Sequence, residues 1–150
     1  MHDTWYPLAV PPFCERLIAF SVPREECVLA VAYDCTCLIR LQARVEIQRD
    51  EETLAYDNYD PTKGIANYCG ETYQMIGLHG GRPIVHSPQG ERLDLGDELR
   101  LWRGDDVAFE TNVENLSGDW AAATFSPDGE LLVLGCPYDF DFRAWRRVTG

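Results

Sequence analysis

A repeated segment is the strongest constraint on how this chain can fold. Ser126–Gly135 reads SPDGELLVLG, and Ser87–Gly96 reads SPQGERLDLG. In both copies the Pro-x-Gly triplet favours a tight turn, because proline presets φ and glycine accepts a positive φ without steric cost. Each copy is followed by a charged stretch and a tryptophan, Trp102 or Trp145, and a fainter third copy runs from residue 20 to 41. The sequence therefore predicts repeated antiparallel β-hairpins.

The copy at residues 126–135 resembles a known repeat family. Phe125-Ser126-Pro127-Asp128-Gly129, together with Trp145, is similar to the inner hairpin and closing strand of a WD40-type β-propeller blade. The resemblance covers residues 125–146, more faintly 86–103, and it implies a propeller-like arrangement of strands. The family's Gly-His start and Trp-Asp ending are missing, since arginine follows both tryptophans. A blade takes about 40 to 45 residues, so the chain has room for roughly three to four blades, fewer than an ordinary ring.

Residues 37–47 carry the clearest strand pattern. Apolar and polar positions alternate there with the period of two that is typical of a half-buried strand, and only Leu38 interrupts the pattern. Residues 48–74 are polar and turn-rich, 50–56 is the one stretch where a short helix is expected, and no segment shows a long 3.6-residue period. The sequence predicts an all-β or mostly β fold of meandering antiparallel hairpins, in one compact domain over 1–150 with little helix and an irregular lead-in at 1–15.

Charge narrows the classes of partner. The 150 residues include 25 Asp and Glu against 13 Lys and Arg, which gives a formal net charge of −12. Nucleic-acid backbones and anionic membrane surfaces are bound mainly through Lys and Arg, so direct binding to either is disfavoured. A basic protein would instead be attracted, although acidity that only maintains solubility is the alternative interpretation. The oligomeric state is left open.

The start of the chain and its cysteines favour a cytoplasmic protein. Met1-His2-Asp3 is not a basic leader, and no apolar run approaches the roughly 20 residues of a membrane helix. The chain has six cysteines. Without an export signal they are expected to be reduced thiols rather than disulfides.

Three groups of residues have the composition of a metal or catalytic site. Cys35 and Cys37 place two thiols on one strand face, but no Cys-x2-Cys pair accompanies them as a zinc site would require. Asp139 and Asp141 share a face in the same way and suit a divalent ion, but no glycine-rich phosphate loop is present. Cys69 with a downstream histidine has the composition of a nucleophile and base. Core thiols and a solvated strand face explain these residues more simply, so no catalytic residue, metal or cofactor is expected.

The segment from residue 50 to 73 is the predicted partner surface. It interleaves carboxylates with tyrosines in a stretch too polar to be all core. Tyrosine is favoured at binding hot spots, and carboxylates complement a basic partner. The residues assigned to this surface are Asp50, Glu51, Glu52, Tyr56, Asp57, Tyr59, Asp60, Tyr68, Glu71 and Tyr73.

These features favour a non-enzymatic, acidic protein-binding module. Its most concrete form is a bacterial immunity or inhibitor protein that neutralises a toxin with a basic site, by analogy of size and charge. One alternative is a propeller-like scaffold that completes its ring by self-association. The other is a small metal-dependent hydrolase that uses Asp139 and Asp141 or the cysteines.

Overall fold

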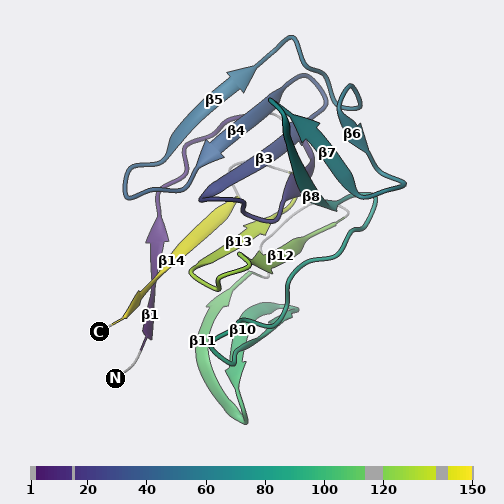
Figure 1. Cartoon of the computed structure of the whole chain (residues 1–150). Helices are drawn as coiled ribbons and strands as arrows, with labels where there is room; N and C mark the ends of the chain where they lie inside the picture. Colours follow the sequence, from purple (N-terminus) through teal and green to yellow (C-terminus); the bar gives the residue numbers. More distant parts are fainter. Residues whose placement is uncertain (1–2, 15, 114–119, 138–141, 150) are drawn as a thin grey trace.

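The regular elements of the protein are all β-strands in the computed structural model, which describes residues 3–14, 16–113, 120–137 and 142–149 (Figure 1). The all-β prediction is confirmed, and these residues include no helix that could cross a membrane. In chain order the strands are β1 (Asp3–Leu8), β2 (Leu17–Ser21), β3 (Cys27–Ala32), β4 (Thr36–Arg40), β5 (Glu46–Asp50), β6 (Tyr59–Asp60), β7 (Ile65–Tyr68), β8 (Glu71–Gly77), β9 (Arg92–Leu95), β10 (Glu98–Arg103), β11 (Asp106–Asn112), β12 (Ala122–Phe125), β13 (Leu131–Gly135) and β14 (Arg143–Thr149).

Within the described residues the strands form three antiparallel sheets. The largest has the order β5-β4-β3-β2-β8-β7-β6, the second β1-β14-β13-β12, and the smallest β11-β10-β9. The four-stranded sheet lies between the other two, with the seven-stranded sheet above it and the three-stranded sheet below it in Figure 1. The central sheet is therefore covered on both faces.

Strand β13 contributes side chains to two apolar clusters, one on each face of the central sheet. Its side chains alternate between faces, so Leu131 and Val133 pack toward the seven-stranded sheet, and Leu132 and Leu134 pack toward the three-stranded sheet. All four side chains are buried. A strand buried on both faces reads as a continuous apolar run, which is what LLVL in the repeated segment provides.

The seven-stranded sheet curls until its two ends approach each other. The Tyr68 hydroxyl in β7 donates a hydrogen bond of 2.8 Å to the Asp50 carboxylate at the end of β5. A third apolar cluster fills the enclosed face, and it includes Leu29, Met75 and Tyr59.

Residues 37–47 form a hairpin, so the prediction of one continuous strand is wrong. β4 ends at Arg40 and β5 begins at Glu46, with a turn between them. Ile39 and Ile47 are paired across the hairpin and pack on the same apolar cluster. The apolar positions before and after the turn are separated by an even number of residues, so the alternation continues through the turn and the sequence resembles a single strand.

Two further expectations are corrected by the structure. Asp3–Leu8, inside the expected irregular lead-in at 1–15, is strand β1 and pairs with β14 along its whole length. No helix forms over 50–56, because the Asp50 carboxylate accepts hydrogen bonds from the backbone N–H groups of Glu52 and Thr53 and so favours turns.

The two repeated turns are confirmed, and they lie against each other. In each, the glycine N–H donates to the serine carbonyl, at 3.1 Å for Gly90 to Ser87 and 2.9 Å for Gly129 to Ser126. The Gln89 side-chain amide in one turn donates to the Asp128 carbonyl in the other at 2.9 Å.

A buried ion pair between Glu91 and Arg147 lies beside these turns. Both side chains are 1% exposed. The Arg147 guanidinium lies 4.4 Å from the centroid of the Trp5 ring, and its Nε donates to the Gly129 carbonyl at 3.0 Å. The Ser87 hydroxyl donates to Glu91 at 3.1 Å. The pair thus connects β1, β14 and both turns.

Replacing Arg147 with methionine is expected to lower the free energy of unfolding by about 3–5 kcal/mol, because the buried Glu91 carboxylate loses its partner. Glu91 would keep the longer contact to Arg103 at 3.7 Å. The matched control is Arg100→Met, which removes exposed pairs to Glu98 and Glu110 and should cost less than about 1 kcal/mol. Urea unfolding measures both, and equal losses would contradict the structural role given to the buried pair.

Gly135→Ala is expected to destabilise the protein by about 1–3 kcal/mol, the usual effect of overpacking. A Cβ at this position would overlap the ring of Phe20, which is completely buried. Gly96→Ala is the control, since a Cβ there meets no atom within 4 Å. Thermal or urea unfolding should show a loss for the first variant and no loss for the second.

Candidate partner-binding groove

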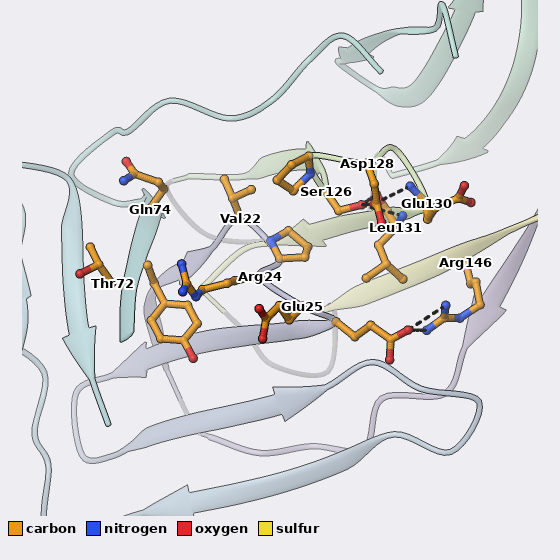
Figure 2. A pocket seen from close by; sticks show the side chains of 14 residues that line it. Val22, Arg24, Glu25, Thr72, Gln74, Ser126, Asp128, Glu130, Leu131 and Arg146 are labelled. Atoms are coloured by element: carbon orange, nitrogen blue, oxygen red, sulfur yellow. Dashed lines mark hydrogen bonds and ion pairs between the residues drawn. The ribbon is translucent and has the colours of Figure 1, made fainter. Parts of the chain in front are cut away.

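A groove of about 610 Å³ lies where turns of the seven-stranded and four-stranded sheets meet (Figure 2). The turn between β2 and β3, residues 22–26, forms one wall, and the turn between β12 and β13, residues 126–130, forms another together with Leu131 at the start of β13. The start of β8 and Arg146 of β14 complete the lining. Each wall is a short hairpin turn, so its position is set by the paired strands on either side.

The floor of the groove is apolar. Val22, Tyr73 and Leu131 line it and are themselves buried side chains. Pro23 and Pro127 add rigid apolar surface. Such a floor suits the aliphatic part of a long side chain.

The rim of the groove carries more acid than base. Four carboxylates and two arginines line it, so the lining has a net formal charge of −2. Arg24 is already paired with Glu71, and Arg146 lies 3.4 Å from Glu26. The carboxylates are Glu25, Glu26, Asp128 and Glu130.

A hydrogen bond stabilises the charged form of one of these carboxylates, and two others have no ion-pair partner among the described residues. The hydrogen bond from the Ser126 hydroxyl, at 2.6 Å, holds the pKa of Asp128 below its usual value. Among the residues that the structure describes, neither Glu25 nor Glu130 has an ion-pair partner. Two carboxylates of the groove are therefore available to a cation.

Glu25 and Glu26 hold the backbone in the left-handed region, with φ of 50° and 69°. They form a two-residue turn that is closed by hydrogen bonds between Arg24 and Cys27 in both directions, at 2.8 and 2.9 Å. Such a turn needs a positive φ at both positions and normally takes Asn-Gly. A left-handed conformation costs about 1–2 kcal/mol per residue for side chains other than glycine. The turn thus tolerates strain and carries two consecutive carboxylates at the groove.

Part of the surface predicted from the sequence remains exposed in the loop 50–57. Asp50 accepts from the Thr53 hydroxyl at 2.7 Å, and Asp57 accepts from the Leu54 N–H at 2.8 Å, so the loop is ordered by its own side chains. Leu54 is 49% exposed, which leaves an apolar contact within the acidic loop. The exposed residues here are Glu51, Glu52, Leu54, Tyr56 and Asp57.

The structure separates the other predicted residues. Tyr59 and Tyr73 are buried in the third apolar cluster, although Tyr73 also lines the groove. Tyr68 is partly buried and bonded to Asp50, and Glu71 is exposed beside the groove. Asp60 is half-buried, and its carboxylate accepts from the backbone of the following turn.

Most of the groove is not predictable from the sequence. The pattern at residues 126–129 predicts only a turn, and the pattern at residues 22–26 predicts no site. A signal was present at Glu25-Glu26, because two adjacent carboxylates separate two strongly apolar segments. Polar residues between strand-like runs mark a turn, but they do not show that the turn borders a groove.

The cysteines and aspartates considered in the sequence as metal ligands or catalytic residues lie away from the groove or outside the described residues. The Cys35 and Cys37 sulfurs lie 3.9 Å apart in the core, and burial raises the pKa of the Cys37 thiol to about 12. Cys69 is exposed. Over the described parts of the chain, no group of three or more His, Cys, Asp or Glu side chains is arranged to hold a metal. Asp139 and Asp141 lie outside the described residues.

Comparison of the chain with protein-family models, curated proteins and solved structures finds no match in any of the three. The WD40-type resemblance at residues 125–146 and 86–103, and the self-associating scaffold that it suggests, stay predictions.

Thr53→Val is expected to raise the pKa of Asp50, and Tyr68→Phe is expected to raise it by less. Hydrogen bonds from the hydroxyls of Thr53 and then Tyr68 hold this pKa below the ordinary 3.8. The stability that the ionised carboxylate contributes is present above pH 3.8 and is lost as the pH falls through the lower folded-state pKa. NMR titration of the carboxyl carbon measures the shifts. Tyr33→Phe is the control, and a shift of equal size there would contradict the assignment.

Proposed function

We propose that this protein is a non-enzymatic binding module that engages a basic protein through the acidic groove. The observation that carries the proposal is the strained turn at Glu25-Glu26. Unfavourable backbone conformations persist where the surrounding structure holds them, and they cluster at functional sites. Here the conformation is held by strand pairing, and it places two carboxylates at the groove.

The groove fits a lysine or arginine side chain of the partner. The aliphatic stem would lie on Val22 and Leu131, and the cationic end would meet Glu25 and Glu130. Because the turn is fixed before the partner arrives, little conformational entropy is lost there on binding.

The remaining acidic surface supports the same kind of partner. A net charge of −12 attracts a basic protein over long distances and accelerates association at low salt. The loop 50–57 adds carboxylates together with Leu54 and Tyr56, each 49% exposed, as apolar contacts. A cytoplasmic immunity or inhibitor protein that blocks the basic site of a toxin is the concrete form of this proposal.

The double variant Glu25→Gln/Glu130→Gln is expected to weaken partner binding at least about tenfold, since hydrogen bonds to charged groups contribute about 1.5–3 kcal/mol each. Glu46→Gln/Asp94→Asn is the matched control, because it removes the same amount of charge from exposed strand positions outside the groove. Tagged protein is used to isolate its partner from a host extract at low salt, and affinities are then measured with the purified partner.

Wild type and control should retain one basic protein that the groove variant binds weakly, and its association rate should fall as salt rises. Equal weakening by both double variants would show that total charge, not the groove, determines binding. Failure of the wild-type chain to retain any protein would contradict the proposed function.

A further inference from the structure

A second pocket, of about 470 Å³, lies next to the groove and has the opposite charge. Gln74 lines both cavities, so the two are neighbours. The second pocket is lined by Lys63, His79 and Arg82, and no carboxylate is among its described lining residues. The acidic groove and this basic pocket therefore present different chemistry at neighbouring places on the protein.

The two cations of this pocket are uncompensated. Lys63 is the only lysine in a chain of net charge −12. In the described parts of the chain, neither Lys63 nor Arg82 has an ion-pair partner. The nearby Asp60 directs one carboxylate oxygen to the backbone N–H groups of Thr62 and Lys63, at 3.0 and 3.2 Å. A ligand with negative charge would supply the missing partner.

The backbone around the pocket is held in place on both sides. In the turn that carries Lys63, the Gly64 N–H donates to the Asp60 carbonyl at 2.9 Å. On the other side, a side chain at Gly81 would overlap the backbone of Met75 and Ile76, so this segment packs directly on β8. The Tyr56 hydroxyl and His79 Nε2 are hydrogen-bonded at 2.8 Å, which orients the imidazole. The imidazole and the backbone that carries the two cations are thus positioned before any ligand binds.

We propose that this pocket binds the phosphate group of a small molecule. An arginine fork, a lysine ammonium and the Thr62 hydroxyl offer more donors than one carboxylate needs, whereas a phosphate accepts from several directions. The volume falls in the range of about 300–1,000 Å³ that is usual for small-molecule sites. A nucleic-acid polymer is disfavoured because the rest of the surface would repel its backbone. This site does not depend on the function proposed for the groove.

Titration with inorganic phosphate, followed by backbone amide NMR, tests the site. Saturable shifts are expected in residues 60–64 and 79–82, and sodium chloride at equal ionic strength should not produce them. Lys63→Gln/Arg82→Gln should weaken phosphate binding at least tenfold. Arg44→Gln is the control for loss of an exposed cation elsewhere, since Arg44 lies in another turn and has no ion-pair partner in the described structure.

Three outcomes would overturn the proposal: shifts that do not saturate, equal weakening by Arg44→Gln, or acetate binding as tightly as phosphate. The last would identify a carboxylate site instead. The Lys63→Gln/Arg82→Gln variant should still bind the protein partner of the groove, so failure of one proposal is distinguishable from failure of the other.

Discussion

The buried pair of Glu91 and Arg147 is the constraint on which the layered structure depends. A charge removed from water is tolerated only when its partner is held in place, so the pair fixes β14 relative to the turn before β9. Arg147 also binds the Gly129 carbonyl through its side chain, and its own N–H donates to the Glu130 carbonyl at 2.8 Å. One wall of the acidic groove is thereby positioned by an ion pair in the core.

The preceding residue of β14 positions the opposite wall. Consecutive side chains of a strand point to opposite faces, so Arg146 faces the seven-stranded sheet while Arg147 faces the turns. Arg146 lies 3.4 Å from Glu26 and donates to the Leu41 carbonyl, and the Leu41 N–H donates to the Glu26 carbonyl at 2.7 Å. Two adjacent arginines thus connect both walls of the groove to one strand.

Local signals in the sequence are sufficient for the two repeated turns and for the parity of the strands, but not for the turn between β4 and β5. Pro-x-Gly identified both repeated turns, and even the exception at Leu38 has a structural reason, since this side chain packs on the cluster at the opposite face. Long-range features were not predictable in this way. The pairing of β1 with β14 joins the two ends of the chain, and Glu91 looks like a solvated turn residue until Arg147 is placed beside it. The predicted acidic surface is divided in the structure because Tyr59 and Tyr73 are buried. Their burial depends on how the sheet curls, which is also a long-range feature.

A chain of contacts through β7 and β8 links the loop 50–57 to the groove. Asp50 accepts from Tyr68, Tyr68 is paired with Glu71 across the β7–β8 hairpin, and Glu71 is paired with Arg24 at the groove. Each step is a hydrogen bond, a strand register or an ion pair, so the spacing between loop and groove is determined by the fold. For the basic partner proposed above, this fixed spacing would lower the cost of contacting both places, because binding at the second place would require little further ordering. In the proposed function, the positions at which the fold fixes these carboxylates would therefore determine how the partner is recognised, in addition to the total charge that attracts it.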